Sequence, residues 1–107
     1  MKKLIHIKEG EILKHIDLNK DEYTIGRDES NDIIFREAKV SRKHARLTRE
    51  GNSYFITDLD SANHVRVNGN RIKTRLLESG DIIELSDVVK LLYIKEEKTE
   101  KEIKKVK

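Results

Sequence analysis

The sequence of 107 residues predicts an all-β domain, a sandwich or barrel built from about ten short, mainly antiparallel strands. Its apolar residues occur in short runs, and within these runs they alternate with polar residues at a period of two. Glycine, asparagine, serine and aspartate recur between the runs, where they are typical of turns. The pattern therefore favours hairpins over strands that alternate with helices.

The first predicted hairpin joins Leu4–Ile7 to Ile12–Leu18 through the turn residues Glu9 and Gly10. A strand at 23–25 follows and ends at Gly26. The next hairpin joins the apolar run 44–48 to the run 54–57 across Glu50, Gly51 and Asn52.

The third predicted hairpin contains the strongest local turn signal, Asn68-Gly69, between Val65–Val67 and Arg71–Lys73. Both residue types tolerate positive φ, so the pair predicts a tight primed turn. The last two predicted strands, 82–85 and 88–94, are separated by Ser86 and Asp87.

The chain from residue 95 onward is highly charged, with six lysines and four glutamates among thirteen residues. Such a segment has too little apolar surface to join a sandwich core. We therefore expect one domain over residues 1–95 and a flexible charged tail or linker over 96–107. A short binding helix with Ile103 and Val106 on its apolar face is the less favoured interpretation of the tail.

Composition argues against several classes of function. Cysteine is absent and the four histidines lack metal-ligand spacing, so we expect no disulfide, metal or cofactor. The net charge is +3, of which the tail supplies +2, so the near-neutral remainder does not favour nucleic acid as a partner. The first fifteen residues contain no unbroken apolar run, and we expect a soluble, cytoplasmic protein with no membrane partner. The sequence specifies no oligomeric state.

Polar residues lie next to the predicted strands at three places: Arg27 after Gly26, the segment Ser41-Arg42-Lys43-His44 just before the strand that carries Ala45 and Leu47, and the loop 58–63, which ends in Asn63. A phosphothreonine carries about −1.5 to −2 charges and three acceptor oxygens, so its binding needs positioned donors and positive charge but no catalytic group. The guanidinium groups and the serine hydroxyl supply both.

The order of these segments, followed by Asn68-Gly69 and Gly80-Asp81-Ile82, resembles the forkhead-associated (FHA) domain family over residues 3 to 95. The resemblance implies an FHA-type β-sandwich of about ten to eleven short, mainly antiparallel strands. It also implies a signalling or adaptor module whose loops bind phosphothreonine peptides of proteins phosphorylated by Ser/Thr kinases.

The resemblance also implies roles for individual residues. Arg27, Ser41 and Arg42 match positions that contact the phosphate, and Asn63 matches the asparagine that hydrogen-bonds the peptide backbone. Four further residues match architectural positions: Gly26 at the close turn, His44 behind the Ser41 loop, and Asn68 and Gly69 in the hairpin.

The chain departs from the family pattern at two positions. Ala62 replaces a residue whose hydroxyl often adds a phosphate contact, and His64 replaces the glycine after Asn63. Affinity is then reduced, or Arg42 and Lys43 compensate. His64 either narrows the loop or acts as a pH-sensitive neighbour of the phosphate.

Three alternatives compete with phosphopeptide binding. The main one is an FHA-like scaffold that binds a protein partner without phosphate, through a sheet face or an exposed edge strand. An enzyme would use Ser41, His44 and Asp58 or Asp60 as a triad, but no Gly-x-Ser-x-Gly elbow is present. A nucleic-acid patch would draw on Arg42, Lys43, Arg46, Arg49, Arg66, Arg71 and Arg75, but the five aromatic residues are expected in the core.

Peptide selectivity is expected to depend on two variable loops, 36–40 and 70–78. Their charged residues predict some tolerance of acidic residues in the peptide. These residues are Arg36, Glu37, Lys39, Arg71, Lys73, Arg75 and Glu78.

Overall fold

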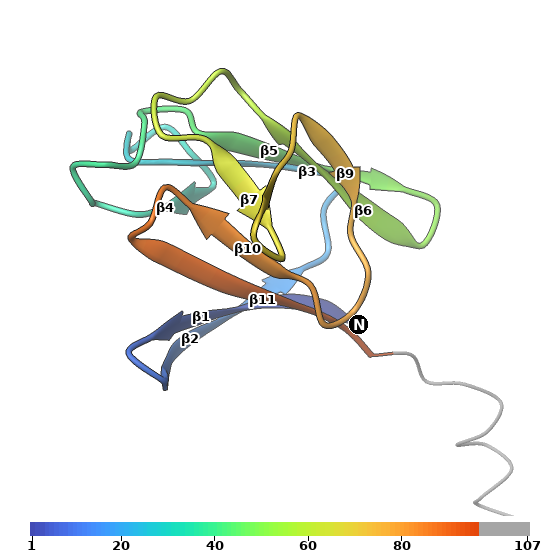
Figure 1. The fold of residues 1–107 in the computed structure, drawn as a ribbon. Coiled ribbons are helices and arrows are strands. Elements are labelled where there is room, and N and C mark those ends of the chain that lie inside the picture. Colours follow the sequence, from blue (N-terminus) through green and yellow to red (C-terminus); the bar gives the residue numbers. More distant parts are fainter. Residues whose placement is uncertain (97–107) are drawn as a thin grey trace, which may run out of the picture.

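The computed structural model describes residues 1–96, which form a sandwich of two β-sheets and contain no helix (Figure 1). The predicted all-β, mainly antiparallel fold is confirmed, with eleven strands in the described part of the chain. Apart from Glu96, the predicted tail lies outside the described residues. The strands are β1 (Lys2–Lys8), β2 (Glu11–Leu18), β3 (Glu22–Gly26), β4 (Ile33–Ile34), β5 (Ala45–Glu50), β6 (Ser53–Asp58), β7 (Val65–Val67), β8 (Asn70–Arg71), β9 (Thr74–Leu76), β10 (Ile82–Leu85) and β11 (Val89–Lys95).

One sheet has six strands in the order β2-β1-β11-β10-β7-β8, and the other has five in the order β4-β3-β5-β6-β9. Among the described strands, β3 and β4 form the single parallel pair, with Ile25 opposite Ile33. All other pairs are antiparallel. β2 is the longest of the four edge strands, since β4, β8 and β9 have only two or three residues each.

All three predicted hairpins form, and their turns have the expected backbone. Asn68 and Gly69 have φ of 51° and 86°, so this turn is of the primed type, whose twist matches that of the flanking strands. Glu9 and Gly10 likewise have positive φ, between Lys8 and Glu11. The predicted separation of β10 from β11 near Ser86 and Asp87 is also confirmed.

The expectation that residues 70–78 form a loop is wrong. The segment contains β8, which pairs with β7, and β9, which crosses to the other sheet and pairs with β6. β9 runs antiparallel to β6, with Thr74 opposite Thr57 and Leu76 opposite Phe55. Only the start of the segment therefore lies near the end of β6.

Alternation along the strands places one set of apolar side chains between the two sheets. In β6, Tyr54 and Ile56 are fully buried. Phe55, which was expected in the core, points to the other face and is only half-buried. The core cluster contains the other four aromatic residues, Tyr23, Phe35, Tyr54 and Tyr93, and fifteen aliphatic residues from Leu4 to Leu91.

The two ends of the sandwich differ in what they carry. The segments 27–32, 35–44 and 59–64 meet at one end, where backbone hydrogen bonds join Arg27 to Ser41 and Leu59 to His44. At the other end the backbone N–H of Glu96 donates to the carbonyl of Met1. Figure 1 shows this separation, with the N-terminus away from the loops around β4. Within residues 1–96 there is no helix long and apolar enough to cross a membrane.

Candidate functional site

The end of β3 lies against the loop that precedes β5. The N–H of Arg27 donates to the carbonyl of Ser41 at 3.0 Å, and the N–H of Asp28 donates to that of Arg42 at 3.2 Å. A Cβ on Gly26 would lie 2.1 Å from the Arg42 carbonyl oxygen. Only a glycine permits this close approach of two backbones, which sets Arg27 beside Ser41.

The Arg27 side chain is anchored at one nitrogen only. Its Nε donates to the carbonyl of Val40, a buried residue, at 3.0 Å. The side chain is exposed, and its two terminal nitrogens have no partner among residues 1–96. The guanidinium is therefore held in place while its terminal donors remain able to bind an anion.

The buried side chain of His44 links the loop before β5 to the loop after β6. It is 0% exposed; its Nδ1 accepts from the Ser41 N–H at 3.0 Å, and its Nε2 lies 2.8 Å from the His64 carbonyl. Since Nδ1 accepts a hydrogen bond, Nε2 carries the ring N–H and donates a hydrogen bond to the carbonyl. Both ring nitrogens thus bind backbone groups, so His44 is not placed to deprotonate the Ser41 hydroxyl.

The Ser41 hydroxyl lies where the loops meet. Its Oγ accepts a hydrogen bond from the backbone N–H of Ala62 at 3.0 Å, and the residue is half-buried. This contact leaves the hydroxyl proton to be donated. The exposed side chain of Arg42 makes no ion pair within residues 1–96, while Lys43 Nζ lies 3.3 Å from the Ser30 hydroxyl. The segment that carries the Ser41 hydroxyl therefore also carries two exposed cationic side chains.

Asn63 and Ala62 belong to the third loop. The Asn63 side-chain Nδ2 donates to the carbonyl of Lys39 at 2.9 Å, which ties this loop to the one before β5. Its Oδ1 has no partner in the described part of the chain, and the residue is exposed. The amide therefore keeps an acceptor, and one of its two N–H groups, for an extended peptide backbone.

His64 has a left-handed backbone with φ of 68°. A glycine would adopt this conformation without strain, which agrees with the glycine that the resemblance implies at this position. The half-buried His64 borders two hollows, of about 430 and 370 Å³, on either side of its loop.

Asn31 was missed by the sequence analysis although it holds two loops together. It is buried, and its Nδ2 donates to the carbonyls of Arg42 at 2.6 Å and Asp28 at 2.8 Å. Asparagine is common in any polar loop, so residue type alone gives no signal here. Its role depends on the crossing of two segments eleven residues apart.

Two carboxylates stabilise the loop after β3. Hydrogen bonds from the side chain and the backbone N–H of Ser30 lower the pKa of Asp28. Asp32 accepts from the N–H of Thr24 at 2.8 Å and from Lys20 at 2.9 Å, and these bonds lower its pKa. Both groups are thus kept ionised: Asp28 is bound within its own loop, and Asp32 ties the end of that loop to β3 and to Lys20.

The charges expected to set selectivity are mostly paired within the chain. Arg36 lies 3.5 Å from Glu29, Lys39 lies 3.6 Å from Asp87, and Lys73 lies 3.1 Å from Asp60. Arg75 and Glu78 both contact Asp81, Arg75 through its guanidinium at 3.4 Å and Glu78 through its backbone N–H at 2.9 Å. Arg71 makes no ion pair among residues 1–96 and lines the hollow beside His64.

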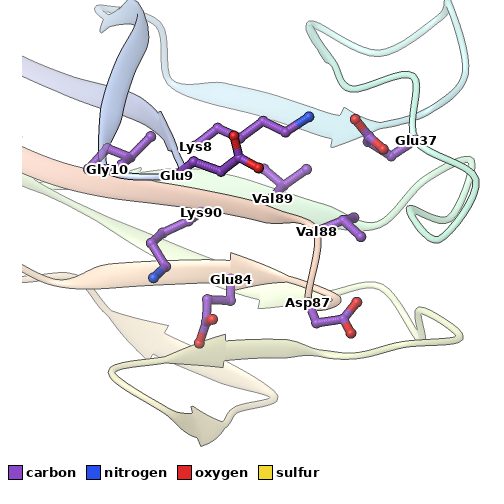
Figure 2. A pocket seen from close by; sticks show the side chains of 10 residues that line it. Lys8, Glu9, Gly10, Glu37, Glu84, Asp87, Val88, Val89 and Lys90 are labelled. Carbon is purple, nitrogen blue, oxygen red and sulfur yellow. The ribbon is translucent and has the colours of Figure 1, made fainter.

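Three of the arginines considered for a nucleic-acid patch are paired with carboxylates. Arg46 pairs with Glu22 at 3.2 Å, Arg49 pairs with Asp21, and Arg75 is occupied by Asp81. A further hollow of about 420 Å³, shown in Figure 2, lies between the β1–β2 turn and the β10–β11 turn. Its lining carries both signs of charge and includes Glu37, one of the residues expected to affect selectivity, but none of the residues predicted to bind the phosphopeptide. The described residues contain no cluster of metal-ligating side chains.

Comparison with known proteins identifies the family to which this arrangement of strands and loops belongs. Residues 23–86 match the FHA domain family. The transcriptional regulatory protein EmbR of Mycobacterium tuberculosis is 44% identical over 64 residues, which cover 59% of this chain and 16% of EmbR. The oxoglutarate dehydrogenase inhibitor of Corynebacterium diphtheriae is 32% identical over 64% of this chain and 48% of the inhibitor.

The solved structures give the same result. The structure of Mycobacterium tuberculosis EmbR in complex with a low-affinity phosphopeptide superposes with a TM-score of 0.81 and 33% identity, over 92% of this chain and 25% of that one. The chain spans less than half the length of these curated relatives. The match extends over both sheets and all three site loops, and the chain belongs to the FHA domain family.

Proposed function

We propose that this chain is a phosphothreonine-peptide-binding module, which acts in signalling by recognising proteins that Ser/Thr kinases have phosphorylated. The observation that carries the proposal is the placement of Arg27 beside Ser41, with the guanidinium anchored on Val40 and its terminal nitrogens unpaired within residues 1–96. EmbR, a relative with the same fold, has been solved with a phosphopeptide.

In this proposal the phosphate is bound by three side chains. Arg27 contributes a forked pair of donors, the Ser41 hydroxyl donates to a phosphate oxygen, and Arg42 adds exposed positive charge. Charge-assisted hydrogen bonds contribute on the order of 1.5 to 3 kcal/mol each, so two of them separate phosphorylated from unphosphorylated peptide by about a hundredfold or more.

Asn63 holds the peptide rather than the phosphate. Its Oδ1 accepts from a peptide N–H, while the bond from Nδ2 to the Lys39 carbonyl fixes the amide. Lys43 adds charge beside Ser30, and Ala62 contributes its backbone N–H to the Ser41 hydroxyl rather than a phosphate contact of its own. His64 flanks the peptide path.

The proposal assigns no catalysis to the site. Phosphate binding by Arg27, Ser41 and Arg42 needs no group that exchanges a proton, and the FHA family is a family of protein-interaction modules. His44 acts as a brace, since backbone groups bind both of its ring nitrogens.

Calorimetric titration with phosphothreonine peptides tests the proposal. We expect dissociation constants near 1 µM, about −8 kcal/mol, and no comparable binding of the unphosphorylated peptides. Arg27→Ala is expected to weaken binding by about 2 kcal/mol. Arg49→Ala is the matched control, because Arg49 lies on β5, outside the loops, and pairs with Asp21. Equal affinity for phosphorylated and unphosphorylated peptides would disprove the proposal.

One observation favours a second candidate, a scaffold that binds a partner without phosphate. β2 is an eight-residue edge strand on which Ile12 is 59% and Leu13 is 55% exposed. Such an edge is able to add a strand from a partner. The same titration tests it: Leu13→Lys would abolish binding that does not depend on phosphate, and would leave phosphopeptide binding unchanged.

A further inference from the structure

The β7–β8 hairpin places two arginines directly opposite each other. Arg66 is the register partner of Arg71, across the primed turn at Asn68 and Gly69. Val65 and Val67 are buried, so Arg66 projects from the outer face of its sheet. Opposed residues in an antiparallel pair have Cβ atoms about 5 Å apart, and like charges there are unfavourable.

The protein does not neutralise this pair. Neither arginine makes an ion pair with any residue from 1 to 96, whereas the nearby Lys39 and Lys73 are each paired with an aspartate. Glu84 is opposite Arg66 on β10, but it is also opposite Lys90 on β11. Figure 2 shows Glu84 and Lys90 on these neighbouring strands. The row from Arg71 to Lys90 thus has three cations and one carboxylate.

The arginine pair adjoins the site loops. A hollow of about 370 Å³ is lined by Asn63, His64 and Arg66, together with Asp87, which pairs with Lys39. The hollow that contains Arg71 is also lined by His64, together with Asp58 and with Asp60, which pairs with Lys73. Arg66 follows Asn63 by three residues, so their backbones are at most about 10 Å apart. An extended peptide held by Asn63 covers that distance with about three residues.

We infer that Arg66 and Arg71 form a second anion-binding site, which accepts an acidic or phosphorylated side chain from the segment that carries the phosphothreonine. This inference rests on the proposed function, because it takes Asn63 as the residue that holds the peptide. An anionic group between the two guanidinium groups is attracted by both and offsets their mutual repulsion. The site adds selectivity for acidic partners beyond recognition of the phosphate.

The test uses the full chain and fluorescent peptides in a two-by-two design. One factor is phosphothreonine or threonine, and the other is alanine or aspartate, scanned over four positions on either side. A further peptide carries phosphoserine at the best aspartate position, so that carboxylate and phosphate can be compared. Affinities come from fluorescence anisotropy for the parent chain, for the Arg66→Gln/Arg71→Gln double variant, and for Arg49→Gln, which removes a charge outside the loops.

We expect aspartate to tighten binding by about fivefold at one or two positions, and phosphoserine to tighten it further. The preference should be lost in the double variant and kept in Arg49→Gln, while the phosphothreonine peptide with alanine flanks binds all three proteins within about twofold. An aspartate preference that survives in the double variant, or no preference in the parent chain, would overturn the inference. The phosphothreonine-to-threonine ratio reports separately on the proposed function, and failure of every peptide to bind would overturn both.

Discussion

At the scale of single residues, the geometry of the site depends on positions that do not themselves contact a ligand. Gly26 allows β3 to pass against Arg42, and His44 and Asn31 bind backbone groups of two loops each. Each of these residues acts on Arg27 or Ser41 through the backbone.

Replacement of Gly26 by alanine is therefore expected to destabilise the fold. The new Cβ would lie 2.1 Å from a backbone oxygen, which cannot move without separating the loop from β3. We expect a loss of about 3 kcal/mol in the free energy of unfolding, measured by urea titration. Gly51→Ala is the control, since no atom lies within 4 Å of its Cβ and only the strain of its positive φ is added, about 1 kcal/mol. Equal losses in the two variants would contradict the steric argument.

His64 offers the opposite case, a residue whose backbone is strained. His64→Gly relieves a φ of 68° and should raise the free energy of unfolding by about 0.5 to 1 kcal/mol. His15→Gly is the matched control because His15 lies in strand β2, where glycine should reduce stability by a similar amount. Thermal melts of both variants measure these changes in stability. A fall in Tm for His64→Gly would contradict the claim that the His64 backbone is strained.

The sequence allowed most of the site residues to be recognised, but it did not supply their contacts. Arg27, Ser41 and Asn63 stand in a spacing that marks them together. Asn31 has no such mark, because its importance arises only where two loops cross. The roles in phosphopeptide binding remain predictions for the titrations to decide.

At the scale of elements, the hairpin β7–β8 does more than turn the chain. Asn68 adopts positive φ, its Nδ2 donates to Asp81 at 2.9 Å, and its Oδ1 accepts from the N–H of Ile82 at 2.9 Å. The turn is thereby bonded to the start of β10, and this fixes the strand that carries Arg66.

Substitution of Asn68 separates these two contributions. Asn68→Ala loses both side-chain hydrogen bonds and strains the backbone, and it should cost about 2 kcal/mol of unfolding free energy. Asn68→Gly loses the same bonds without strain and should cost about 1 kcal/mol. Chemical denaturation of both variants measures the difference, and equal costs would show that backbone strain contributes nothing.

Strands were predictable where local turn signals defined them. The Asn68-Gly69 turn even implies the register that opposes Arg66 to Arg71, so this pair was within reach of the sequence. β4 and β9 were not predicted, because two or three residues show no periodicity and these strands exist only through pairing with β3 and β6. The expectation of a loop over 70–78 was wrong for the same reason, since β8 and β9 are short strands that exist through pairing with β7 and β6.

At the scale of the whole molecule, the core contains a tyrosine whose buried hydroxyl is poorly satisfied. Tyr93 is fully buried, its hydroxyl makes no hydrogen bond of good geometry within residues 1–96, and burial raises its pKa to about 12. Burial also raises the pKa of Tyr54. Both residues lie in the core between the sheets, so ionisation of either hydroxyl lowers the free energy of unfolding of the whole sandwich.

Stability should therefore fall in alkaline solution. A tyrosine in the unfolded chain has a pKa of about 10, so the contribution of Tyr93 is complete below pH 10 and is lost as the pH rises toward 12. Tyr93→Phe should be at least as stable at pH 7, and its Tm should fall less between pH 9 and 11.5. Parallel Tm curves for the two proteins over that range would contradict the assignment.

The pairing of β1 with β11 also has a mechanical consequence. Lys2 is opposite Lys95 in this antiparallel pair, and Glu96 bonds back to Met1, so a force applied at residues 1 and 96 pulls neighbouring strands apart from the same end. The hydrogen bonds of this ladder would break one after another, as in unzipping, instead of resisting together in shear. Tension on the chain would then open the sandwich at the end away from the three site loops. Optical-tweezer unfolding through residues 1 and 96 should require less force than unfolding through residues 8 and 96, which loads β1 and β11 along their length.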